Sequence, residues 1–384
     1  MYDLPSIEPT DRFTALTVMN DVRGITVGDP MNALPPGAEL GAIREAAPDL
    51  KHALVASGMP TAVTTCDLIT LPYPVNFGLW RAARSPAPFL WITNRMIVVQ
   101  FDDAEGTPRT LLWEASDHEQ GEYTPYFARL KARNPLPESV LATEHGTVLG
   151  HLRALGIAPE AVDYVAFDHL HTQDPRRLIG TTRPAPDLGS PEEPIAPWFP
   201  NARLISQRRE WETIRHLHPL QVPWYQPETY RDLPHERLAL IDGDVLLGPG
   251  VALIATPGHT AGNMSLAVNT SSGVWTSSEN GVAAESWAPR VSRIPGLRSW
   301  SVEWGQEVIL NANTLEFASW QYNSMVLERL LADPAADAPV PQCFPSSELT
   351  RNRLAPGVSP TFVHQAIDHG QIRGSALVAP GAAA

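Results

Sequence analysis

The sequence has few of the residues that mark a disulfide scaffold or a nucleic-acid-binding protein. Its 384 residues include two cysteines, and 28 Lys+Arg stand against 42 Asp+Glu, for a formal net charge of −14. Cys66 and Cys343 lie far apart, which argues against a disulfide framework or a cysteine-rich zinc module. A nucleic acid or an anionic membrane would need a concentrated basic patch, and the sequence shows none. We therefore expect no nucleic acid and no membrane as a partner.

Long apolar runs and targeting signals are also lacking. No apolar run approaches the ~20 residues of a membrane-spanning helix. The first residues, MYDLPSIEPTDRF, lack the basic region followed by an apolar stretch that a secretory signal needs. With 43% hydrophobic residues, however, the chain can bury a substantial core. These features predict a folded cytoplasmic protein.

Hydrophobic patterns predict two β-rich halves with helices between them. The segment 180–200 holds six prolines, too many for a regular element, and is expected to be a surface loop that acts as an insertion or a lid. Trp198 and Phe199 would either cover a cleft or pack on the surface. We expect strands at 89–92, 95–101, 109–113, 161–167, 202–206, 237–241, 251–256, 264–268 and 273–277, and helices at 137–153, 208–217 and 315–332.

Histidines follow two of the predicted strands. His169 and His171 stand in FDHLHTQD, where i, i+2 spacing at a strand end places both imidazoles on one side of the backbone. His259 stands in ATPGHTAGN, where Gly258 and Gly262 permit sharp turns and close approach of the backbone. Three neutral imidazoles that leave one coordination position open are typical of a catalytic zinc site.

Each of these patterns also has an ordinary structural explanation. An isolated HxH is common in proteins that bind no metal. Asp174 and Pro175 fit the N-cap and the first residue of a helix as well as Asp174 fits a metal ligand. Glu279, in WTSSENG after a predicted strand, is either a ligand or a solvated loop carboxylate. The sequence leaves these alternatives open.

Taken in order, four segments resemble the metallo-β-lactamase superfamily of metal-dependent hydrolases. GIAPEAVDYVAFDHLHTQD (156–174) resembles the strand that leads into the family's HxHxDH motif, and PNARLISQRREWE (200–212) resembles the strand and helix that follow. LIDGDVLLGPGVALIATPGHTAGNMSLAV (240–268) is similar to the segment that carries the family's third histidine. VWTSSEN (274–280) falls where the family places a metal-bridging aspartate.

The resemblance is clear over about residues 90–280 and implies an α+β fold. That fold is a four-layer αββα sandwich of the metallo-β-lactamase type, in which two sheets pack face to face and the metal lies at one edge. Residues 1–384 would form a single domain with a Pro-rich insertion at 180–200. A helical C-terminal extension would begin at about residue 285.

The resemblance implies that His169, His171 and His259 hold the first metal ion of the family. The second site departs from the family's pattern, and a neutral glutamine in place of its aspartate cannot accept a proton. The residues at the family's second-site positions are Gln173, Asp174 and Glu279. The family usually supplies one more histidine after a later strand, and Ser346 is the nearest residue to that position by order along the chain.

The activity implied by the resemblance is metal-dependent hydrolysis. A metal-bound hydroxide would attack an ester, lactone, amide or related bond of a small-molecule substrate. Asp174 would act as second-metal ligand or general base, and Glu279 would complete or bridge the metal shell. Zn²⁺, as one or two ions, is the expected cofactor, with Fe or Mn as alternatives. A di-iron oxidoreductase and a non-catalytic metal-binding scaffold remain as alternatives, and a homo-oligomer is left open.

Overall fold

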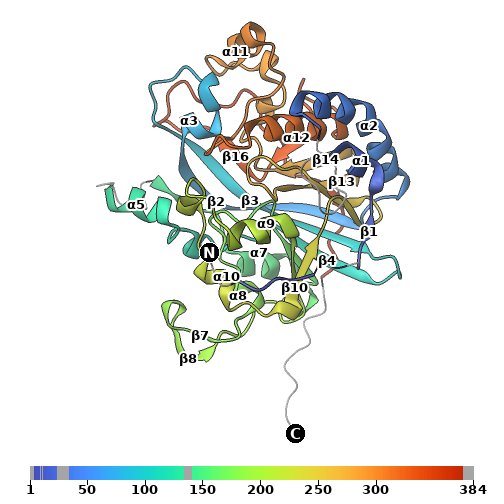
Figure 1. Cartoon of the computed structure of the whole chain (residues 1–384), viewed down its shortest axis with the longest axis vertical. Helices are drawn as coiled ribbons and strands as arrows, with labels where there is room; N and C mark the ends of the chain where they lie inside the picture. Colours follow the sequence, from blue (N-terminus) through green and yellow to red (C-terminus); the bar gives the residue numbers. More distant parts are fainter. Residues whose placement is uncertain (1–3, 9, 11, 24–33, 134–140, 375–384) are drawn as a thin grey trace.

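Two β-sheets pack face to face, and helices cover the outer face of each, which makes four layers (Figure 1). The structure is a computed structural model that describes residues 4–374 except 9, 11, 24–33 and 134–140. The predicted four-layer αββα sandwich is thus confirmed. None of the described helices is long and apolar enough to cross a membrane.

The larger sheet has nine strands in the order β10-β9-β6-β4-β3-β2-β17, with β16 beside β3 and β5 beside β2. The pairs β4 with β6, β6 with β9 and β9 with β10 are parallel, and the other pairs of this sheet are antiparallel. The strands are β2 (Ala62–Pro74), β3 (Phe89–Asp102), β4 (Pro108–Trp113), β5 (Thr143–Glu144), β6 (Tyr164–Ala166), β9 (Arg203–Gln207), β10 (Leu238–Ile241), β16 (Ser347–Thr350) and β17 (Asp368–Gly370).

The smaller sheet has six strands in the order β1-β11-β12-β13-β14-β15. All pairs are antiparallel except β14 with β15. Both ends of the described chain thus contribute strands, because β1 joins this sheet and β17 joins the other. The strands are β1 (Thr14–Ala15), β11 (Val245–Gly248), β12 (Val251–Ala255), β13 (Met264–Thr270), β14 (Gly273–Ser278) and β15 (Cys343–Pro345).

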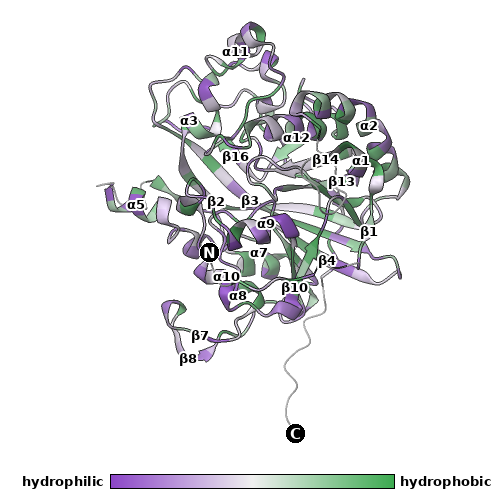
Figure 2. Ribbon diagram, in the orientation of Figure 1, coloured by the Kyte–Doolittle hydropathy of each residue, from purple (hydrophilic) through white to green (hydrophobic). Residues whose placement is uncertain are grey.

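The alternation of side chains along β3 shows how the layers arise from the sequence. Ile97, Val99 and Phe101 point into the core between the two sheets. Met96 and Val98 point the other way, toward the helices. Successive side chains of a strand face opposite sides, so a run that is apolar throughout must be covered on both faces. Figure 2 shows this apolar character along the central strands, whereas the hairpin of β7 (Pro184–Ala185) and β8 (Ser190–Pro194) is hydrophilic.

Two pairs of helices supply the outer layers. Helices α7 (Val148–Leu155) and α9 (Arg208–Arg215) pack on the nine-stranded sheet. Helices α2 (Pro36–Ala56) and α12 (Ala318–Leu331) pack on the six-stranded sheet. The remaining helices are short: α1 (Asn20–Arg23), α3 (Val75–Gly78), α4 (His118–Gly121), α5 (Pro125–Arg133), α8 (Arg176–Ile179), α10 (Glu228–Arg231) and α11 (Leu297–Trp304).

Several predicted boundaries differ from the structure. Part of the helix expected at 137–153 lies outside the described residues, and α7 begins only after Thr147, whose side chain caps it by accepting from the Gly150 amide at 3.1 Å. Its end at Gly156, in the left-handed conformation, agrees with the prediction. Asn94 was expected to divide two strands, but β3 continues through it because strands pair with it on both sides.

The Pro-rich segment and the C-terminal region also differ from expectation. A short hairpin of β7 (Pro184–Ala185) and β8 (Ser190–Pro194) forms within 180–200, because its prolines lie on strands that pair on one side only. From about residue 285 the chain is helical only in part. After α12 it returns through β15 to one sheet and through β16 and β17 to the other.

The turn between β11 and β12 provides a test of backbone crowding. Gly250 has φ +67°, and a Cβ there would lie 2.6 Å from the Gly58 carbonyl oxygen. Gly305 has φ +64° with nothing within 4 Å of such a Cβ, so it is a matched control. Both Ala variants adopt the left-handed conformation at a cost of roughly 1–2 kcal/mol. We expect Gly250→Ala to lower the free energy of unfolding by about 1–3 kcal/mol more than Gly305→Ala, because of overpacking. Equal urea-unfolding free energies for the two variants would contradict this close contact.

Candidate metal centre

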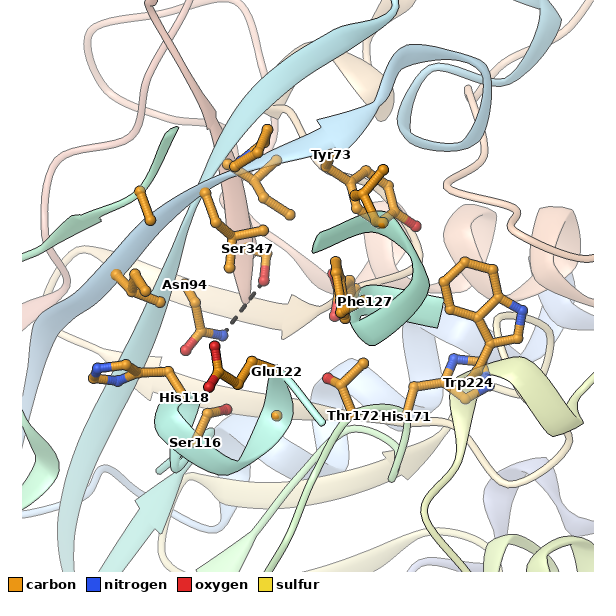
Figure 3. A pocket seen from close by; sticks show the side chains of 18 of the residues that line it. Tyr73, Asn94, Ser116, His118, Glu122, Phe127, His171, Thr172, Trp224 and Ser347 are labelled. Atoms are coloured by element: carbon orange, nitrogen blue, oxygen red, sulfur yellow. Dashed lines mark hydrogen bonds between the residues drawn. The ribbon is translucent and has the colours of Figure 1, made fainter. Parts of the chain in front are cut away.

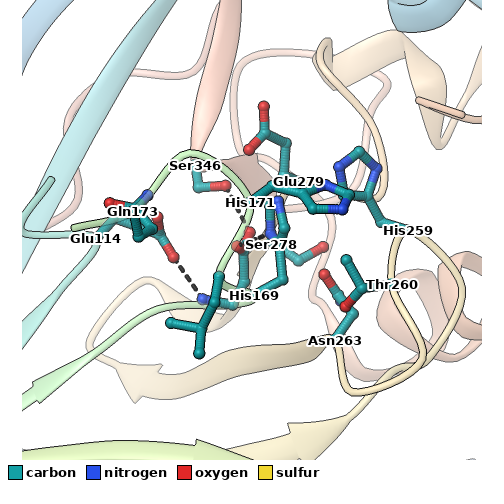
Figure 4. Close-up of polar contacts among 12 residues, drawn as sticks. Glu114, His169, His171, Gln173, His259, Thr260, Asn263, Ser278, Glu279 and Ser346 are labelled. Carbon is teal, nitrogen blue, oxygen red and sulfur yellow. Dashed lines mark hydrogen bonds and ion pairs between the residues drawn. The ribbon is translucent and has the colours of Figure 1, made fainter. Parts of the chain in front are cut away.

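Three loops at strand ends meet at one edge of the sandwich (Figure 4). His169 and His171 lie in the loop that follows β6 of the larger sheet. His259 lies between β12 and β13 of the smaller sheet, and Glu279 follows β14. The predicted role of Gly258 in close packing agrees with the structure, since a Cβ there would lie 2.1 Å from Gln321 Cα of α12.

The three histidines converge. Their ring centroids lie 4.8 Å apart for His169 and His171, 4.5 Å for His169 and His259, and 5.3 Å for His171 and His259. One nitrogen from each ring lies within 4.8 Å of the others, and all three side chains are buried. Separations of this size allow three imidazoles to bind one ion.

Each ring has one nitrogen held by an acceptor of the protein. Nδ1 of His169 bonds to the Asp168 carboxylate. Nδ1 of His259 lies 2.7 Å from the carbonyl oxygen of Asn311. Nε2 of His171 lies 2.8 Å from Oε1 of Gln221. Since a neutral imidazole that donates from one nitrogen has its lone pair on the other, the lone pairs lie on Nε2 of His169 and His259 and on Nδ1 of His171, which is 3.5 Å from Nδ2 of Asn313.

The orientation of Gln221 is itself determined by its neighbours. Its Nε2 donates to Thr314 Oγ1 at 3.2 Å and to Glu316 Oε1 at 2.6 Å, so its oxygen faces His171. Beside this ring, the buried Oδ1 of Asn313 has no hydrogen-bond partner. Outer partners that orient imidazoles are the usual support of a metal site. The donor set and the unpartnered oxygen therefore fit a divalent cation.

The surroundings of the rings set their protonation states. Burial lowers the pKa of His171, and it lowers the pKa of His259 to about 3, with the charge of His169 acting in the same direction. Burial also disfavours the charged form of His169, but the neighbouring Asp168 carboxylate outweighs burial and raises the pKa to about 9. Neutral imidazole is the form that binds a metal. Two rings are thus held in that form, and the third has the carboxylate partner common among metal-binding histidines.

Glu279 lies beside the histidines at the wall of a cavity. With Asp168 and His169 it forms a second group whose ligand atoms all lie within 4.8 Å of one another. Burial raises the pKa of Glu279 to about 7, although the charge of His169 opposes this. Its carboxylate is thus at the centre rather than in a solvated loop.

Asp174, predicted as a ligand or base, bonds to Arg176 in the structure. It belongs to neither group of candidate metal ligands among the described residues. Its carboxylate accepts from Arg176, with Nε at 3.0 Å and Nη2 at 2.8 Å, and from the Arg176 backbone amide at 3.1 Å. The alternative, that Asp174 supports the start of the following helix α8, agrees better with these bonds.

Glu210 bonds to the loops of the histidines and was not predicted from the sequence. This buried carboxylate accepts from the Leu170 amide at 3.0 Å, between the first two histidines. It also accepts from Thr260 Oγ1 at 2.6 Å and from the Gly262 amide at 3.2 Å, in the loop of the third. The available signal was a glutamate beside Trp211 on the apolar face of a predicted helix, where a charge needs partners.

Asp168, Gln221 and Asn311, the partners of the three rings, were also missed. Asp168 directly precedes His169, and this adjacency was a signal in the sequence. Gln221 and Asn311 are far from the histidines along the chain, and one acts through its backbone carbonyl. Nothing in the sequence pattern marks them.

A cavity of about 450 Å³ opens beside the histidines (Figure 3). Among the described residues, none from 180–200 lines it. Phe199 is instead buried in the core, and Trp198 packs on Arg177, so of the two alternatives for these aromatics the structure agrees with packing rather than with a cover over the cleft. Phe127, Leu130 and Lys131 of helix α5 are among the residues that line the cavity. The wall is largely apolar and includes Ile69, Leu71, Pro72, Tyr73, Phe89, Trp91, Ile92, Phe127, Leu130, Leu141 and Trp224.

Comparison with known proteins gives partial matches. No protein-family model matches the chain. Over 128 residues the chain is 30% identical to an N-acyl homoserine lactonase of Bacillus thuringiensis. This matched stretch is 33% of this chain and 41% of the lactonase. A lactonase of Bacillus cereus is 29% identical over 130 residues, with the same two shares of 33% and 41%. The chain thus matches less than half of the length of these curated relatives.

Solved structures are similar to the chain at low identity and with TM-scores under 0.5. A quorum-quenching N-acyl homoserine lactone lactonase is 21% identical, with a TM-score of 0.41 over 65% of this chain and 88% of its own. A probable metal-dependent hydrolase from Staphylococcus aureus is 11% identical, with a TM-score of 0.48 over 70% and 84%. AidC, a dizinc quorum-quenching lactonase, is 13% identical, with a TM-score of 0.45 over 79% and 94%. The chain is thus similar in sequence to N-acyl homoserine lactonases over a third of its length.

Proposed function

We propose that the protein is a metal-dependent hydrolase of lactones or esters that carry an apolar substituent. The observation that carries this proposal is the convergence of three buried imidazoles whose other nitrogens are held by acceptors. The relatives named N-acyl homoserine lactonases support a lactone as the reacting group. The apolar cavity beside the histidines supports an apolar substituent.

His169, His171 and His259 would hold the ion, and we propose Zn²⁺ because an all-imidazole set suits it. When bound, this ion supplies Lewis acidity that polarises a carbonyl and activates water. Glu279 lies at the same wall of the cavity and is the proposed acceptor of the proton that water releases. The apolar wall would bind the substituent and exclude water from around it.

The di-iron alternative depended on two carboxylates at the centre. Asp174 is bonded to Arg176, so of the two predicted carboxylates Glu279 alone lies at the centre. A set dominated by imidazoles favours zinc chemistry over carboxylate-bridged iron. We therefore propose hydrolysis rather than oxygen chemistry.

Removal of one imidazole tests the metal site directly. We expect His259→Ala to weaken Zn²⁺ binding by more than the roughly 10- to 100-fold that loss of an outer partner causes. The exposed His52 on α2 is a matched position, so His52→Ala should bind Zn²⁺ as the unmodified chain does. Competition with a chromophoric chelator measures both affinities. Unchanged affinity in His259→Ala would remove this histidine from the site.

The role of Glu210 in positioning the loops is testable with an isosteric change. In the unmodified protein both carboxylate oxygens of Glu210 accept hydrogen bonds, and Glu210→Gln replaces one of these oxygens with an NH2 group. The loops of His171 and His259 therefore lose support. We expect Zn²⁺ affinity to fall by about 10- to 100-fold and the visible spectrum of the Co²⁺-loaded protein to change. Glu212→Gln, on the same helix and paired with Arg215, is the control. A Co²⁺ spectrum identical to that of the unmodified protein would contradict this role.

The cavity predicts a preference for long apolar substituents. Phe127 of α5 lines the cavity (Figure 3), and Phe127→Ala removes part of its apolar wall. We expect KM for a long-chain acyl lactone to rise by about 10-fold, with little change for a short-chain one, since a Phe contributes roughly 1.5–3 kcal/mol on full burial. Tyr123→Ala, at a 63% exposed site outside the cavity, is the control. Equal losses for both chain lengths would contradict binding of the chain by this wall.

A further inference from the structure

We propose that the centre holds a single metal ion, in the three-imidazole site, and that the residues at the family's second-ion positions form fixed bonds within the protein instead. The inference rests on the proposed function, in which the protein binds a metal, and it adds the number of ions bound. It distinguishes this chain from the dizinc lactonase with which it was compared.

The carboxylate of Asp174 is already neutralised by a buried cation. Arg176 donates to both of its oxygens through Nε and Nη2, at 3.0 and 2.8 Å. The same guanidinium also bonds Asp187, at 3.0 and 2.6 Å. An arginine cannot give up its charge, so a metal ion at Asp174 would have to displace it and leave it short of a buried partner. Asp174 is therefore not available to a second ion.

Gln173 presents a donor where the family has a carboxylate. Its Nε2 donates to Ser116 Oγ at 3.0 Å, and both residues line the cavity. Its backbone carbonyl accepts from Tyr230 at 2.7 Å, which fixes the loop in place. A neutral amide held in this way supplies no charge to balance a second dication.

Ser346 stands where the chain crosses between the two sheets, and it too is a donor. Its Oγ donates to Asp168 Oδ2 at 2.8 Å, and its amide donates to the Ser278 carbonyl at 3.2 Å. Asp168 also holds His169. The position nearest to the late histidine of the family thus supports the first site and offers no imidazole.

The group of Asp168, His169 and Glu279 does not provide a second site alongside the first. It shares His169 with the three-imidazole group. A neutral imidazole has one lone pair, since its other nitrogen carries the proton donated to Asp168. His169 can therefore serve only one of the two groups at a time. The ion would lie in the group with three imidazoles. Glu279 would then remain available to bind the open coordination position of that ion or to accept a proton.

The number of ions is measured on the intact chain. Protein saturated with Zn²⁺ and freed of unbound metal should contain one equivalent by elemental analysis. Protein loaded with Mn²⁺ should show the EPR signal of an isolated ion. Two equivalents, or a spin-coupled Mn²⁺ pair, would overturn the single-ion proposal and leave the hydrolase proposal standing. No bound metal at all would overturn both.

A variant tests the assignment of the second position without measuring activity. Asp174→Asn keeps the shape of the side chain and removes its charge. We expect its Zn²⁺ content to remain at one equivalent, with any loss confined to stability, because Arg176 loses a partner. His171→Ala is the contrasting variant and should lose the single equivalent. A fall in Zn²⁺ content in folded Asp174→Asn would make this residue a ligand and overturn the proposal.

Discussion

The buried carboxylate of Glu210 is the interaction on which the rest of the centre depends. It accepts four hydrogen bonds, from the Leu170 amide, Tyr225 Oη, Thr260 Oγ1 and the Gly262 amide. A carboxylate without partners is very costly to bury, so these four groups must be in place once the sandwich has formed. Because these groups come from three separate parts of the chain, at Leu170, at Tyr225 and at 260–262, the loops of all three histidines are held in one arrangement.

The need of buried polar groups for hydrogen-bond partners also determines which nitrogen of each imidazole carries the proton. Buried rings take acceptors for their N–H groups, and a carboxylate, an amide oxygen and a backbone carbonyl supply them here. The lone pairs are thereby turned toward a common point. That point lies at the wall of an apolar cavity, so a reacting group held there has apolar surface on one side and fixed nitrogens on the other. This combination supports a hydrolase for substrates with an apolar part.

The predicted strands and histidines were recognisable because they depend on local pattern. Alternation along β3 marks a strand covered on both faces, and Gly156 ends α7 in the left-handed conformation that only glycine adopts readily. The role of Asp174 could not be predicted in the same way. A carboxylate before Pro175 fits both a metal ligand and a loop bond, and the choice depends on where Arg176 points after folding. The C-terminal strands were missed because their partners lie in distant strands of both sheets.

Hydrophobic period and residue type alone predicted two β-rich halves and the three histidines as candidate ligands. The resemblance of ordered segments to a known family implied the layered fold and the departure at position 173. The folded arrangement was needed to show which nitrogen of each ring bonds to an outer acceptor, which carboxylates lie at the centre, and that residues of helix α5 rather than of the Pro-rich segment line the cavity. Those outcomes depend on contacts between residues far apart in the chain, such as Gln221 with His171 and Ser346 with Asp168. Such contacts leave no periodic trace in a single sequence.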